Sequence, residues 1–169
     1  MSPILVSDIK LYHSGGAANA DPNASLGGII STTQITDNSL HNLFDKISGA
    51  EAETGDTEYR CFFIKNTPAT LTYQSVKVYI YTNTPSTDTD VNISVATETG
   101  SPVQTIANES TAPTAQTFSN PTNIGTALNI GDLAAGASKA IWVKRTVSAL
   151  ASAYANDNVV IKFEGDTDA

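Results

Sequence analysis

The sequence has almost no cysteine, because Cys61 is the single one among 169 residues. One thiol cannot form an internal disulfide, so the fold does not depend on cross-links, as is usual for proteins made in a reducing cytoplasm. No apolar run approaches the roughly 18 residues of a membrane span. Residues 1–6 lack the basic start and the long apolar run of a signal peptide. We therefore expect a soluble, unprocessed product made in a host cytoplasm and not secreted.

Charge is also scarce, and positive charge is the scarcest. Only 15% of the residues are charged, with 9 Lys and Arg against 17 Asp and Glu, which gives a net charge of −8. An acidic surface repels phosphate backbones and anionic lipids. This balance argues against nucleic acid and against a membrane as partners.

Recognisable catalytic and cofactor motifs are missing. No phosphate loop, dinucleotide fingerprint or zinc-ligand spacing occurs. The two histidines are His13 and His41, and Cys61 lies in an apolar run, where a thiol usually behaves as a small hydrophobe. The pair His41 and Asp45 and the turn at residues 88–90 offer metal-ligand atoms, but a solvated surface explains both more simply. The sequence predicts a non-enzymatic protein with no cofactor and no metal.

Strand patterns dominate what is present. Residues 59–65 are apolar on both faces, as in a central strand, and residues 76–81 alternate, with the valines and isoleucine facing inward. Residues 139–147 and 159–163 are further strands, and turn-forming residues separate them. These patterns predict a single domain, residues 1–169, with an all-β fold: an immunoglobulin-like or jelly-roll β-sandwich whose core spans residues 56–165.

Two segments before this core differ from it. Residues 1–33 predict a strand followed by an extended N-terminal arm, because residues 14–28 are mostly small and turn-forming. In the helix-containing segment 34–50, residues 37–47 carry apolar side chains at the spacing of one helical stripe. We expect Asp37 to cap this one short helix and Gly49 to end it. The tail at residues 165–169 is polar and is expected to fray.

Two surfaces are candidates for contacts with other proteins. Tyr79 and Tyr81 fall on the outward face of one strand, where paired aromatic side chains often mark an interface, although a covering loop explains them equally well. The arm is the second surface, because a segment of small residues can order on a neighbour. Its candidate residues are Ser14, Gly15, Gly16, Asn19, Asp21, Pro22 and Asn23.

Several segments resemble a family of uncharacterised structural proteins of tailed bacteriophages. The first reads SDIKLYHSGGAAN and begins at Ser7. The other segments are 21–28, 42–45, 55–61, 65–67, 140–145 and 163–167. The resemblance covers most of the chain. It implies a β-sandwich component of the virion, without a catalytic or binding residue to carry over.

The expected function is therefore that of a virion structural protein. The first hypothesis is a capsid decoration or cement protein that binds the outer shell, through the major capsid protein, as a homo-oligomer. The alternative is a neck or tail protein that attaches fibres. A further alternative, from another class, is a carbohydrate-binding module that stacks sugars on Tyr79, Tyr81 or Trp142.

Overall fold

The computed structural model describes residues 3–68 and 70–167, and the predicted all-β sandwich is confirmed. Within these residues nine strands, two short 3-10 helices and one short α-helix follow one another along the chain. The strands are β1 (Ile9–His13), β2 (Gly27–Gly28), β3 (Asp56–Asn66), β4 (Tyr73–Thr82), β5 (Thr89–Val95), β6 (Val103–Thr105), β7 (Leu128–Leu133), β8 (Ser138–Val147) and β9 (Val160–Thr167). The 3-10 helices are Val6–Asp8 and Pro22–Ala24, and α1 is Gly49–Thr54.

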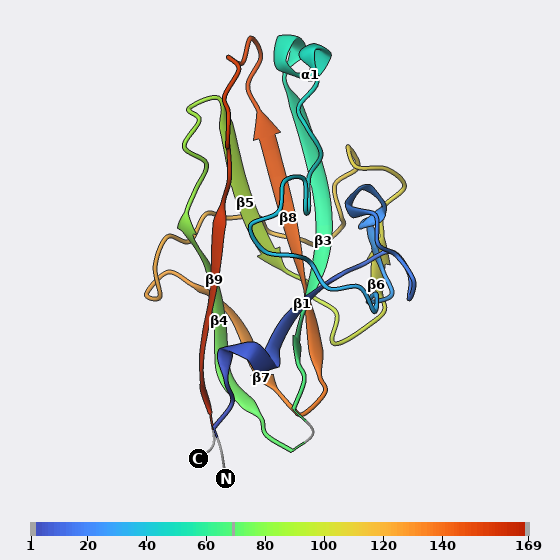
Figure 1. The fold of residues 1–169 in the computed structure, drawn as a ribbon, viewed down its shortest axis with the longest axis vertical. Coiled ribbons are helices and arrows are strands. Elements are labelled where there is room, and N and C mark those ends of the chain that lie inside the picture. Colours follow the sequence, from blue (N-terminus) through green and yellow to red (C-terminus); the bar gives the residue numbers. More distant parts are fainter. Residues whose placement is uncertain (1–2, 69, 168–169) are drawn as a thin grey trace.

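The strands form three antiparallel sheets. The largest has the order β1-β3-β8-β5, the second the order β7-β4-β9, and β2 pairs with β6 in a small third sheet. The long strands run along the domain, with α1 at one end (Figure 1). At the other end the Ile4 N–H donates to Thr167 Oγ1 at 3.0 Å.

Two layers of apolar side chains lie on opposite faces of the four-stranded sheet. One face packs Phe62, Ile141 and Val143 against Val78 and Ile80 of β4. The other face packs a second set, to which residues beside β2 and in or just after β6 contribute: Leu26, Cys61, Phe63, Val103, Ile106, Ala140 and Trp142. Strands β3 and β8 are therefore buried on both faces, which confirms the central position predicted for residues 59–65.

The predicted helix at residues 37–47 is wrong. This segment consists of turns and bends, and the left-handed φ angles of Asn38 (54°) and His41 (57°) interrupt any helix. Leu43 and Phe44 still pack on the core between the two large sheets, while Leu40 is 77% exposed. The apolar spacing thus reflects an irregular covering segment and not a helical stripe.

The α-helix begins at Gly49, the residue predicted to end a helix. Ser48 caps it, because its hydroxyl accepts from the Glu51 N–H while the Glu51 carboxylate accepts from the Ser48 N–H at 2.5 Å. This capping box was visible in the sequence as Ser-x-x-Glu.

At the C-terminal end of the chain, the prediction of a frayed tail is wrong for residues 165–167, which belong to β9. Residues 168–169 lie outside the described residues.

Candidate functional site

The predicted arm is folded onto the domain and does not extend away from it. Ser14 is fully buried: its hydroxyl donates to the Cys61 carbonyl at 2.7 Å and accepts from the Gly27 N–H at 3.0 Å. Gly15 has a φ of 95°, and a Cβ there would lie 2.0 Å from the Ala24 carbonyl oxygen. A larger residue at position 15 would push Gly15 and Ala24 apart, so Gly15 serves close packing within the domain.

The polar residues of this segment bond within the chain. Asn19 donates to the carbonyls of Ser14 at 2.6 Å and Asp21 at 3.0 Å. The Asp21 carboxylate accepts from the Asn23 N–H at 2.9 Å, and Pro22 begins the 3-10 helix between them. Gly15, Asp21 and Asn23 are exposed, whereas Gly16, Asn19 and Pro22 are half-buried. A partner that reaches these residues meets an ordered loop.

Tyr79 and Tyr81 differ in exposure. Tyr79 is 4% exposed, and its hydroxyl donates to Glu164 at 2.5 Å. Tyr81 is 64% exposed, with the Lys162 ammonium 5.5 Å from its ring centre. Trp142 is fully buried, so neither it nor Tyr79 can stack on a sugar. Of the three aromatic side chains named for a carbohydrate platform, only Tyr81 is available.

Strand β9 carries an ion pair beside these tyrosines. Lys162 Nζ lies 2.9 Å from a Glu164 carboxylate oxygen. The hydrogen bond from Tyr79 lowers the pKa of Glu164, and the contact with Glu164 raises the pKa of Lys162. Both side chains are therefore charged at neutral pH.

The thiol and the imidazole considered for catalysis are both enclosed. Cys61 is fully buried, and burial raises the pKa of its thiol well above the usual range. His13 is 5% exposed, its Nδ1 lies 3.2 Å from the Ser25 hydroxyl, and burial lowers its pKa. A buried thiol with a raised pKa is not a nucleophile at neutral pH.

A buried cluster of charges lies near the start of β3, and sequence reasoning missed it. Arg145 donates to one Glu58 carboxylate oxygen from Nε at 2.7 Å and again from Nη2. Arg60, fully buried, donates to Glu109 at 2.5 Å. The Phe44 ring lies under both guanidinium groups, at 5.4 Å from Arg60 and 4.8 Å from Arg145.

A sequence signal for this cluster did exist. Glu58 and Arg60 lie on the same face of β3 as Phe62. Arg145 lies on the same face of β8 as Ile141 and Val143. Charges on a core-facing register must be paired. In the structure Asp45, Glu58 and Glu109 bring carboxylate oxygens within 4.8 Å of one another, and the two arginines supply the positive charge among them.

The loop that joins β8 to β9 presents an apolar tip beside α1. Leu150 is 81% exposed and has a left-handed φ of 62°. Its N–H donates to the Glu53 carbonyl at 3.2 Å, and the Ala151 N–H donates to the Ala52 carbonyl at 2.9 Å. Tyr154, in the same loop, is 54% exposed. The loop and α1 meet at the end of the domain opposite to residues 4 and 167 (Figure 1).

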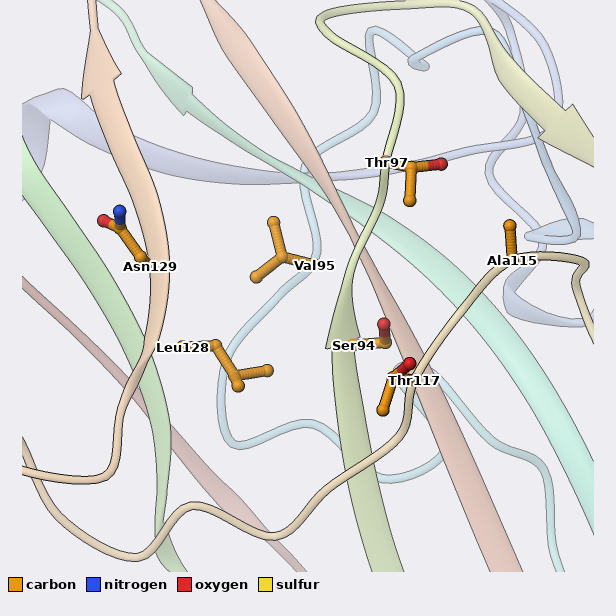
Figure 2. A pocket seen from close by; sticks show the side chains of 7 residues that line it. All are labelled: Ser94, Val95, Thr97, Ala115, Thr117, Leu128 and Asn129. Carbon is orange, nitrogen blue, oxygen red and sulfur yellow. The ribbon is translucent and has the colours of Figure 1, made fainter.

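Two shallow hollows also open on the surface. The first has a volume of about 250 Å³ and lies between β5, β7 and the chain around residue 116 (Figure 2). Its lining is uncharged: Ser94, Val95, Thr97, Ala115, Thr117, Leu128 and Asn129. The second, of about 260 Å³, lies beside Lys77 and Glu164. Its lining is mostly polar and charged: Ser75, Lys77, Ile124, Glu164, Gly165 and Asp166.

Comparisons of the chain with protein-family models, with curated proteins and with solved structures found no match. Within residues 3–68 and 70–167, no helix is long and apolar enough to cross a membrane. The candidate site therefore depends on the chain's own geometry, and its best-defined exposed feature is the Leu150 tip beside α1.

Proposed function

We propose that this chain is a structural protein of a tailed-bacteriophage particle, a decoration protein that binds the outer surface of the assembled shell. The resemblance of the segments quoted above supports the virion assignment. Four of these segments meet in the folded domain, because residues 14 and 25 bond to Cys61, and Cys61 lies opposite Trp142 in the sheet. The resembling residues thus belong to one packing unit of the fold.

One observation carries the choice of contact surface: Leu150 is held, almost fully exposed, in a left-handed conformation. The left-handed backbone costs about 1–2 kcal/mol. Such strain is retained where the surrounding structure fixes it and where it serves a contact. Because two backbone hydrogen bonds to α1 fix this tip, it can enter a pocket of a partner without a further loss of backbone freedom. The proposed shell contact is therefore the α1 end of the domain and not the arm expected from the sequence.

The position in the particle is tested by labelling. Residues 4 and 167 lie at the end opposite to α1, so a tag fused beyond either one leaves the α1 end free. Gold label against the tag is expected over the whole head in electron micrographs, and particles assembled without the protein are the control. Label confined to the neck or tail would instead support a fibre-attachment protein, and unlabelled particles would remove the virion function.

The contact itself is tested by Leu150→Asn. Asparagine adopts the left-handed conformation more readily than leucine, so the free energy of unfolding is expected to stay equal or rise slightly. Binding to shells that lack the protein is expected to weaken by at least tenfold, because a buried apolar anchor is lost. Co-sedimentation of shells with increasing protein concentration measures the affinity.

Leu40→Asn is the matched control for this variant. Leu40 is 77% exposed, close to the 81% of Leu150, but it lies in the segment before α1 and outside the loop that joins β8 to β9. Its replacement is expected to leave the shell affinity unchanged. Equal affinity of Leu150→Asn and the wild type would show that the shell contacts another part of the domain.

A further inference from the structure

Residues 160–166 of β9 lie at an edge of the three-stranded sheet. In the four-stranded sheet, loops cover both edges: residues 31–35 bond to β1, and Ser119 exchanges two backbone hydrogen bonds with Ile93 of β5. No backbone hydrogen bond joins residues 160–166 to any described segment other than β4. An edge with free N–H and C=O groups is a template for another strand.

β9 is also the more regular of the two edges of its sheet. It spans 8 residues, against 6 for β7. The register shifts between β4 and β9 place the extra residues on β4, whereas one shift between β4 and β7 places an extra residue on β7 itself. A second strand can therefore pair along β9 without meeting a bulge.

The charges on β9 select one register for pairing with an identical strand. Lys162 and Glu164 occupy the outer face, and Ile161 and Phe163 pack toward the core. In a two-fold antiparallel pair centred on Phe163, Lys162 lies opposite Glu164 of the second copy, and Glu164 lies opposite Lys162. Moving the centre by one residue in either direction places Lys162 or Glu164 opposite itself, which is unfavourable.

On the inner face of this register, Phe163 lies opposite Phe163 of the second copy. Ile161 lies opposite Gly165, where the Tyr73 ring already occupies the position of a Cβ. Charged edge residues usually prevent strand pairing. Here the opposite charges of Lys162 and Glu164 favour the register centred on Phe163 and disfavour the two neighbouring registers.

We propose that two copies of this chain associate through β9, antiparallel and centred on Phe163, so that the two three-stranded sheets form one six-stranded sheet. The interface is isologous, as in most homodimers. This association goes beyond shell binding and concerns a different surface. It is measured in solution without particles, so its failure and the failure of the proposed function are distinguishable.

The test uses two charge reversals that cannot pair with themselves but can pair with each other. Lys162→Glu presents two carboxylates on the edge, and Glu164→Lys presents two ammonium groups. Sedimentation velocity over a concentration series is expected to show a dimer for the wild type. For each variant alone the dissociation constant is expected to rise by about tenfold or more, because two attractive pairs become repulsive. An equimolar mixture is expected to restore the wild-type constant.

Lys46→Glu is the control for net charge, because Lys46 is exposed and lies outside β9. It is expected to dimerise like the wild type. A monomeric wild type at millimolar concentration, or a mixture that stays monomeric, would overturn the proposal.

If a variant does not fold, the association is tested on the wild type alone. Amide hydrogen exchange at residues 160–166 is expected to slow as the protein concentration rises. Exchange that is independent of concentration would overturn the proposal as well.

Discussion

Replacement of Arg145 with methionine is expected to lower the free energy of unfolding by about 3–5 kcal/mol at neutral pH. Arg145 donates twice to Glu58, whose side chain is 1% exposed, and once to the Asp45 carbonyl at 2.8 Å. Without Arg145, the nearest positive charge to Glu58 is Arg60 Nη2, at 3.7 Å and already bonded to Glu109. The loss arises because a buried carboxylate remains without its main partner.

The deficit of this variant is expected to shrink in acid. Burial raises the pKa of Glu58 above its ordinary value, and Arg145 is the largest influence opposing that shift. Removal of Arg145 therefore raises the pKa further. A raised carboxyl pKa contributes stability below the unfolded value, and this contribution is lost as the pH rises through the folded pKa. The charge penalty of Arg145→Met is thus complete above the folded pKa of the variant and absent below about pH 4.5.

Denaturant unfolding of the variant and the wild type at a series of pH values measures this difference. Trp142, the single tryptophan, is fully buried and reports unfolding by its fluorescence. Lys144→Met is the control, because Lys144 lies on the opposite face of β8 and is only half-buried. Two outcomes would contradict this explanation: an equal loss of stability in both variants, or an Arg145→Met deficit that does not change with pH. Either would mean that removal of Arg145 does not leave an uncompensated charge on Glu58.

Local alternation predicted the strands well, because a period of two depends on adjacent residues alone. Residues 59–65, 76–81 and 139–147 all lie within observed strands, and Val76, Val78 and Ile80 face the core as expected. The helix failed because the spacing of four apolar residues at 37–47 is also compatible with an irregular segment. There, tertiary packing of Leu43 and Phe44 outweighed local periodicity.

The contact surfaces were harder to predict, because exposure depends on residues distant in sequence. Alternation placed Tyr79 and Tyr81 on one face. Tyr79, however, is buried and donates a hydrogen bond to Glu164, 85 positions further along the chain, so only Tyr81 is exposed. Nothing in the sequence marks Leu150 as left-handed. Its conformation follows from hydrogen bonds to residues 52–53, about a hundred positions earlier. The buried charges were also missed, although the strand register already places Glu58, Arg60 and Arg145 on a core face.

Replacement of Gly27 with alanine is expected to lower the free energy of unfolding by about 2–5 kcal/mol. Gly27 has a φ of 93°, and a left-handed backbone costs alanine about 1–2 kcal/mol. In addition, the new Cβ would lie 2.0 Å from the Gln104 carbonyl oxygen and 3.0 Å from Trp142 Cη2. Overpacking of a tight core adds about 1–3 kcal/mol.

Gly136→Ala separates these two causes. Gly136 has a φ of 74°, but a Cβ there meets nothing within 4 Å, so only the backbone cost of about 1–2 kcal/mol is expected. The clash at Gly27 falls between β2 and β6, which pair Gly27 with Thr105 over the buried Trp142. The Gly27→Ala protein is therefore expected to show red-shifted Trp142 fluorescence before global unfolding, and Gly136→Ala is not. Equal losses with unchanged fluorescence would mean that backbone conformation alone requires Gly27 and that the β2–β6 layer tolerates a methyl group.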